Sequence, residues 1–283
     1  MLNEFWTLLS TPFMQRSLIV AVLVGISAPI IGTYLVQRRL ALLGDGIGHV
    51  CLTGVALGWF IGNTVGFVRA DSLAIPGAVV AAVVGAILIE VVRERGQTSG
   101  DVALSLLFYG GIAGGVLIMG LAGGTTANLN GYLFGSLASV SWSDVVITAI
   151  LATLIIGVGV GLLPSLFSLC HDEEFARASG LPVKFLTTLI AVVAALTVST
   201  AMRVVGVLLV SALMIVPVAI AQLVSRSFRE TMSIATVMGV CLCLFGLIIS
   251  YFYPVSSGAT IVCAAIAVYA LVAIFRPVIL KIR

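Results

Sequence analysis

Charged residues are scarce in this chain. Asp, Glu, Lys and Arg together make up 9% of its 283 residues, whereas soluble domains carry about 25%. Hydrophobic residues make up 61%, and the mean hydropathy is +1.26. The formal net charge of +3 is too small and too scattered for a nucleic-acid-binding surface. The composition therefore predicts a protein that crosses the membrane several times and excludes a nucleic-acid partner.

Lysine and histidine are the rarest of the ionisable residues, with two of each. Neither lysine stands in a Gly-x-x-x-x-Gly-Lys-Ser/Thr pattern, so this chain does not bind ATP through a P-loop. An intramembrane Ser–His protease would need a reactive serine beside His49, and no nucleophile motif surrounds Ser27 or Ser105 on the neighbouring segments. We therefore expect a protein that is not an enzyme.

Cysteine pairs with metal-ligand spacing are also absent. The five cysteines fall within or beside apolar runs, and Cys241 and Cys243, two residues apart, point in different directions on a helix. We interpret the cysteines as packing residues and expect no disulfide framework.

Long apolar runs fill most of the chain. A window of about 20 residues, the length of one spanning helix, finds nine candidate segments at Ser17–Val36, Leu40–Gly62, Leu73–Val92, Val102–Ala122, Val145–Leu169, Phe185–Met202, Val207–Val224, Thr231–Tyr253 and Ala259–Phe275. The pair around Arg203 reduces this count to eight if one member is a half-helix. We predict an all-α, polytopic helical bundle in which residues 1–283 form a single transmembrane domain.

The basic residues between these segments indicate the orientation, because cytoplasmic loops carry the excess of Lys and Arg. If the loop after the first segment is inside, 11 basic residues fall on the inner side and three on the outer side. The inner set is Arg38, Arg39, Arg93, Arg95, Arg177, Lys184, Arg226, Arg229, Arg276, Lys281 and Arg283. This split predicts a cytoplasmic C-terminus.

One carboxylate and one imidazole stand inside the second segment. Asp45 and His49 are four residues apart, so on a helix they project from the same face, one turn apart. Ionisable groups at membrane depth usually face a protein interior or a water-filled path, and an oxygen and a nitrogen ligand form a half-site for a divalent transition metal. The alternative is structural: Asp45 caps the helix and His49 hydrogen-bonds back to it.

The stretch Cys170–Lys184 is the longest loop on the inner side. Asp172, Glu173 and Glu174 suit the start of a helix, Gly180 suits the position after its end, and a proline follows. We predict a short cytoplasmic helix whose exposed side presents Phe175 and Ala176 to a soluble partner. A capped linker that touches only lipid headgroups is the alternative.

Transport is the function class that remains, and its driving force has to be inferred. A stand-alone secondary carrier usually shows inverted repeats and more acidic residues at membrane depth. The sequence shows no convincing repeat, and only Asp45 is clearly an intramembrane acid. An externally powered permease fits these features better than a proton-coupled carrier or channel that acts alone. A purely structural membrane subunit is the remaining alternative.

Four stretches resemble one family of transporters. They read LVQRRLALLGDGIGHVCLTGVALG, DEEFARASGLPV, RVVGVLLVSALMIVPVAIAQL and YFYPVSSGATIV. Together they are similar to the permease subunit of ABC importers for zinc, manganese and iron, and the match runs from about Ser17 to Phe275. Relatives often carry Ala or Ser within the run Gly44–Gly48, so the glycines predict a less regular helix at this point.

The resemblance implies a homodimeric permease in the cell membrane of a prokaryote. It implies two cytoplasmic ATPase subunits and an extracytoplasmic metal-binding protein as partners, and a transported zinc or manganese ion, with iron as a third candidate, but no permanently bound cofactor. The metal path falls on Asp45 and His49. The ATPase-coupling element falls on Asp172, Glu173, Glu174, Phe175, Ala176, Arg177, Ala178, Ser179 and Gly180.

Two copies of Asp45 and His49 at a dimer axis would provide up to four ligands. Without a cysteine thiolate, they suit a transit site from which the ion must leave. Metal binds the ionised carboxylate and the neutral imidazole, so we expect the affinity to fall at acidic pH.

Overall fold

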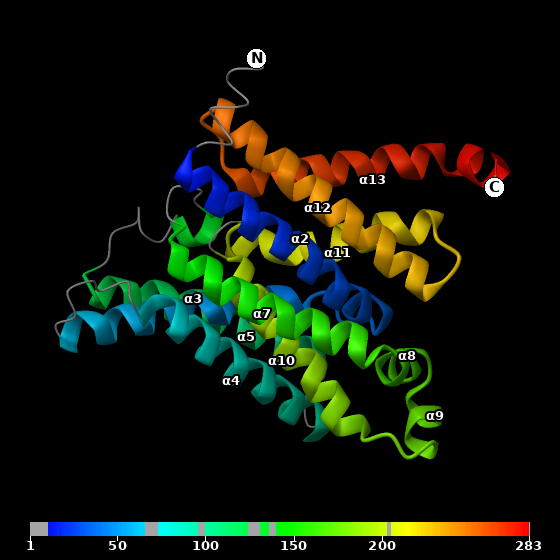
Figure 1. Cartoon of the computed structure of the whole chain (residues 1–283). Helices are drawn as coiled ribbons and strands as arrows, with labels where there is room; N and C mark the ends of the chain where they lie inside the picture. The colour runs from blue at the N-terminus through cyan, green and yellow to red at the C-terminus, as the bar shows by residue number, and fades with distance from the viewer. Residues whose placement is uncertain are drawn as a thin grey trace.

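The chain is an all-helical bundle in the ranges that the structure describes. A computed structural model describes residues 11–65, 73–95, 100–123, 131–135, 140–202 and 205–282. The helices drawn in Figure 1 are α2 (Pro12–Gln37), α3 (Leu43–Val65), α4 (Ala74–Arg95), α5 (Gly100–Leu121), α7 (Trp142–Gly161), α8 (Leu163–His171), α9 (Glu173–Ala178), α10 (Val183–Ala201), α11 (Val207–Val224), α12 (Phe228–Phe252) and α13 (Ser257–Ile282). No strand occurs in these ranges.

Eight of the described helices are long and apolar enough to cross a membrane. The shorter apolar helix Leu209–Val224 lies within α11. The prediction of an all-helical bundle with eight or nine membrane segments is therefore confirmed. One predicted segment is wrong in its length: Val145–Leu169 is divided at Leu162 into α7 and α8, and Pro164 lies in the first turn of α8. Arg203 lies outside the described residues.

Side-chain caps begin two of the spanning helices. The Ser141 hydroxyl accepts a hydrogen bond from the Asp144 backbone N–H, and the Asp144 carboxylate accepts one from the Ser141 backbone N–H, which forms a capping box at the start of α7. The Ser227 hydroxyl accepts from the Glu230 backbone N–H at the start of α12. These bonds satisfy backbone groups that no helix can pair at its own N-terminus.

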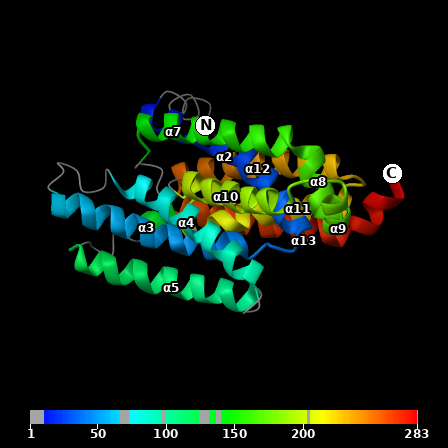
Figure 2. The same ribbon diagram turned by 90° about the horizontal axis from the view of Figure 1, so that it is seen from below.

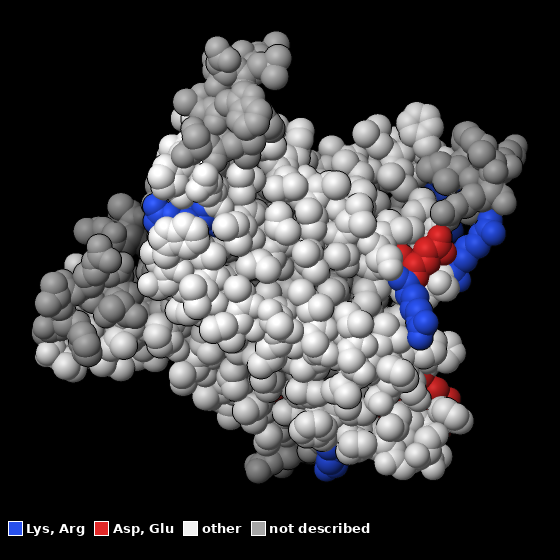
Figure 3. Space-filling model, in the orientation of Figure 1, with Lys and Arg blue, Asp and Glu red and all other residues white. Residues whose placement is uncertain are grey.

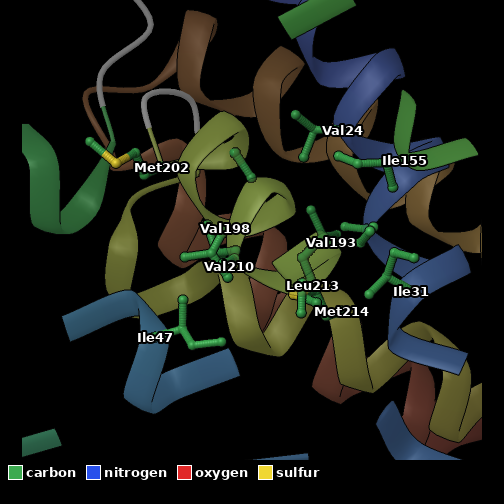
Figure 4. Packing of buried hydrophobic residues seen from close by; sticks show 14 of the residues in the cluster. Val24, Ile31, Ile47, Ile155, Val193, Val198, Met202, Val210, Leu213 and Met214 are labelled. Atoms are coloured by element: carbon green, nitrogen blue, oxygen red, sulfur yellow. The ribbon is translucent and has the colours of Figure 1, made fainter. Parts of the chain in front are cut away.

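The core of the bundle surrounds α10 and α11. Figure 4 shows buried side chains from these two helices packed against residues of α2, α3 and α7; the labelled residues are Val24, Ile31, Ile47, Ile155, Val193, Val198, Met202, Val210, Leu213 and Met214. By contrast, only 22% of the apolar window of α5 and 17% of that of α13 are buried. These two helices therefore present apolar surface to lipid or to another protein.

Most of the described charged groups gather toward one end of the bundle, whereas Arg16, which donates to the Val140 carbonyl, lies near the start of α2 at the other end. Helices α8 and α9 lie at the same end as the close of α13, which Figures 1 and 2 show from two directions. The face drawn in Figure 3 is almost free of charged side chains except near its edges. Such an uncharged band is what a surface in contact with hydrocarbon requires.

Part of the segment between α5 and α7, Gly123–Asp144, packs against the bundle. The Ser256 hydroxyl donates to the Phe134 carbonyl over 3.0 Å. Gly206 has a φ of +91°, and a Cβ atom there would lie 2.4 Å from the Leu133 carbonyl oxygen. This close approach requires glycine. The described part of the stretch is therefore packed backbone rather than a free loop, and residues 124–130 and 136–139 lie outside the described ranges.

Candidate metal site

Asp45 and His49 lie on the first two turns of α3. The helix begins at Leu43 and continues without interruption through the glycine-rich run. Its first turn closes with a hydrogen bond from the Gly46 N–H to the Leu42 carbonyl over 3.1 Å. The predicted irregularity is therefore wrong, and the two side chains project from one face of a regular helix.

The glycines of this run serve close packing. A Cβ atom on Gly48 would lie 3.3 Å from the Val207 carbonyl oxygen of α11, and one on Gly46 would lie 3.1 Å from the Leu104 side chain of α5. Small residues let helices approach closely inside a membrane. The start of α3 is thus held between α5 and α11, and these two helices supply the surroundings of Asp45 and His49.

A pocket of about 150 Å³ opens beside Asp45, between the start of α3 and α5. Its lining residues are Leu42, Asp45, Gly46, Leu104, Ser105, Phe108 and Tyr109. Because a water molecule takes roughly 30 Å³, the pocket has room for a metal ion with a few waters. The Asp45 carboxylate is its one ionisable acid, and carboxylate oxygens are ligands for hard and borderline divalent metals.

Ser211 of α11 holds the Asp45 carboxylate. Its hydroxyl donates a short hydrogen bond to Oδ1 of Asp45. Ser211 lies four residues after the start of α11 and 13 before its end, which corresponds to roughly 20 Å of helix. Asp45 therefore meets α11 in its second turn, well away from the last turn of that helix.

The His49 imidazole is buried and one of its nitrogens is unpaired. The residue is 3% exposed, its ring meets the edge of the Phe108 ring at a centroid distance of 4.2 Å, and its Nδ1 has no hydrogen-bond partner. The structural alternative was a hydrogen bond from His49 back to Asp45, and Nδ1 does not form it. An unpaired buried polar atom costs about 1–3 kcal/mol, and a metal ion bound to it would remove that cost.

Asp45 and His49 have no third candidate metal ligand beside them in the described ranges. No cluster of three or more His, Cys, Asp or Glu side chains suited to a metal ion occurs in the described ranges. Cys51 follows closely in sequence, but its thiol contacts the Ser199 hydroxyl at 3.6 Å, away from the pocket lining. At the start of α3, one copy of the chain thus brings two candidate ligands, one oxygen and one nitrogen, and their role as metal ligands stays a prediction.

The short helix expected in the inner loop is α9. The Asp172 carboxylate accepts a hydrogen bond from the Phe175 backbone N–H, and Glu173 and Glu174 lie in the first turn. Gly180 has a φ of +79° and ends the turn, a conformation that glycine adopts without strain. The predicted caps are therefore present at both ends of the helix.

The exposed face of α9 differs from the prediction in one residue. Phe175 is 62% exposed, as expected, whereas Ala176 is completely buried. The Leu181 N–H donates to the Ala176 carbonyl over 3.1 Å, so the chain folds back over this side of the helix. The surface available to a partner consists of Phe175 and the neighbouring charged residues, and it does not include Ala176.

An ion pair between α9 and the end of α2 was not predicted from the sequence. The Arg38 guanidinium donates to Glu173 over 2.9 Å and to the Thr187 hydroxyl of α10 over 2.8 Å. Glu173 also pairs with Arg177 over 3.2 Å. Arg38 thereby joins α9 and α10 to the segment that leads into α3.

The match with known proteins covers nearly the whole chain. Residues 10–276 match the ABC 3 transport family. The chain belongs to this family. It is 32% identical over 273 residues to the manganese transport system membrane protein MntC of Halalkalibacterium halodurans. The aligned residues cover 96% of this chain and 90% of that protein.

Two further relatives support the assignment to the ABC 3 family. The chelated iron transport system membrane protein YfeD of Yersinia pestis is 30% identical, with 92% of this chain and 86% of that protein covered. The structure of PsaBC from Streptococcus pneumoniae in complex with Fab has a TM-score of 0.84 and 30% identity, with 96% of this chain and 95% of that chain covered. The fold and the family therefore agree.

Proposed function

We propose that this chain is the permease subunit of an ATP-driven importer for a divalent transition metal. The observation that carries the proposal is the Asp45 carboxylate in a pocket between α3 and α5 of an ABC 3 family protein, with His49 one turn further along α3 and outside the pocket lining. The relatives named for manganese and for chelated iron favour Mn²⁺ and Fe²⁺ as the transported ions. Zinc is a weaker candidate, because the relatives described above are named for manganese and iron.

Two copies of the chain complete the metal site in this proposal. Each copy contributes the Asp45 carboxylate and the His49 imidazole, and the poorly buried α5, which forms one wall of the pocket, faces the second copy. Four ligands without a thiolate suit a site that binds an ion transiently. The ATP-binding subunits, two in number, and the extracytoplasmic metal-binding protein are separate chains.

The end of the bundle that carries α9 is the cytoplasmic end in this proposal. Arg38 and Arg177 lie there, and α13 ends on the same side, in agreement with the excess of basic residues that marks cytoplasmic loops. Phe175 is exposed on α9, and in this proposal it contacts the ATPase. ATP binding would move α9 and thereby change which side of the membrane the metal site faces.

Metal uptake into sealed vesicles tests the proposal. The vesicles contain the chain, its ATPase and its binding protein, with ATP on the ATPase side, and uptake of Mn²⁺, Fe²⁺ and Zn²⁺ is measured. We expect uptake to require ATP. Asp45→Ala and His49→Ala should abolish uptake without loss of ATPase binding. His171→Gln, which changes the only other histidine of the sequence, should leave uptake unchanged. Uptake without ATP would instead indicate a stand-alone carrier or channel, and normal uptake by either ligand variant would refute the site.

A further inference from the structure

Ser211 contacts the proposed metal ligand from the side away from the pocket. Asp45 lines the pocket together with residues of α5, whereas Ser211 of α11 does not line it. Nevertheless, the Ser211 hydroxyl donates to Oδ1 of Asp45, and Ser211 is 6% exposed. The carboxylate therefore accepts a hydrogen bond from α11 on one side and faces the pocket beside α5 on the other.

The hydrogen bond of Ser211 differs from those of most buried Ser and Thr hydroxyls in the described helices. Ser and Thr in apolar helices commonly donate to the carbonyl four residues earlier in the same helix, as Thr33, Thr197 and Ser199 do here over 2.8 Å. Ser211 instead donates to a side chain 166 residues away in the sequence. An ordinary back-bonded serine therefore does not account for this contact.

Helices α3 and α11 pack closely at the position of this hydrogen bond. A Cβ atom on Gly44 would lie 3.5 Å from the Ser211 Cβ, and a Cβ on Gly48 would lie 3.3 Å from the Val207 side chain one turn earlier on α11. Glycines one turn apart on α3 thus face residues one turn apart on α11. The short serine side chain reaches Asp45 because these glycines let the two helices approach closely.

We propose that Ser211 is a positioning residue for the metal site. With Oδ1 engaged by the serine hydroxyl, the carboxylate of Asp45 is fixed in one rotamer, and its other oxygen, Oδ2, is available to a metal ion in the pocket. Hydrogen bonds that orient metal ligands in this way typically change metal affinity by about 10- to 100-fold when they are removed. The inference rests on the proposed function, because it requires Asp45 to bind metal.

Direct binding of Mn²⁺ to the permease in lipid nanodiscs tests this role. The free ion gives a six-line electron paramagnetic resonance spectrum, so titration with the metal alone reports the dissociation constant. We expect Ser211→Ala to weaken binding by roughly 10- to 100-fold. Ser211→Thr keeps the hydroxyl and should retain most of the affinity. Thr197→Val is the matched control, since it removes a buried hydroxyl that donates only to its own helix.

The outcomes separate this inference from the proposed function. If Ser211→Ala binds Mn²⁺ as the unaltered chain does while Asp45→Ala does not, the positioning role is refuted and the metal site stands. Equal losses in Ser211→Ala and Ser211→Thr would show that packing, rather than the hydroxyl, matters at this position and would also refute the role. If the unaltered chain binds no Mn²⁺, Fe²⁺ or Zn²⁺, the metal site and the positioning role are both wrong.

Discussion

Removal of the Phe175 side chain should lower the affinity of the ATPase for the permease. Phe175 is 62% exposed on α9, which leaves roughly 120 Å² of its surface for a partner to cover. At about 25 cal/mol per Å², full coverage contributes about 3 kcal/mol and half coverage about 1.5 kcal/mol. Phe175→Ala should therefore weaken binding at each contact by about 10- to 150-fold. The stability of the permease itself should hardly change, because the side chain packs little within the chain.

Binding of the purified ATPase to permease held in nanodiscs is the assay, with stimulation of ATP hydrolysis as a second readout. Phe245→Ala is the matched control, because Phe245 is a phenylalanine of similar exposure, 51%, on α12. We expect the control to bind the ATPase normally. Unchanged affinity and unchanged stimulation with Phe175→Ala would refute the assignment of α9 as the ATPase contact.

Three further predictions concern packing and charge. Gly111→Ala should push α5 away from α3 and lower both thermal stability and metal uptake, because the new Cβ would lie 2.6 Å from the backbone of α3. Gly110→Ala is the control: a Cβ at Gly110 would have no neighbouring atom within 4 Å, so this change should be harmless. Arg38→Glu and Glu173→Arg should each reduce the coupling of ATP hydrolysis to transport, and the double variant, which exchanges the two partners, should recover part of it. If the loss in the double variant equals the sum of the two single losses, the residues do not form a direct pair. Tyr34→Phe, which leaves the α7 carbonyl without its donor, should lower stability by about 1–3 kcal/mol in a thermal melt with uptake otherwise intact.

The helical architecture was predictable because it depends on local features. Apolar runs of spanning length gave the segments, and the acidic start and Gly180 gave the limits of α9. The shared face of Asp45 and His49 followed from helical periodicity alone. The side of α9 that is buried could not be predicted, because a helix of six residues is too short for its apolar pattern to define a face. Ala176 is buried by the chain that follows it.

Contacts between segments far apart in the chain could not be predicted from the sequence. Ser211 lies in an apolar run where a hydroxyl usually bonds to its own helix, so its residue type alone gives no sign of the bond to Asp45. Arg38 was identified only as a basic residue that orients the chain, and its partner Glu173 is 135 residues away. Both contacts depend on how the helices pack, and a single sequence without its relatives carries little information about such pairs.

Arg38 joins α9 to the stretch of chain that leads to the proposed metal site. Its side chain is only 10% exposed and bonds to Glu173 of α9 and Thr187 of α10. The next residue, Arg39, has a φ of 58°, a left-handed conformation that is strained for a residue with a Cβ atom. Asp45 follows only six residues later, so a movement of α9 would act on the start of α3 through a short, tightly bent connection. Because α3 is also held by α11, such a movement would change the spacing of the two helices around the Asp45 carboxylate rather than displace the whole bundle.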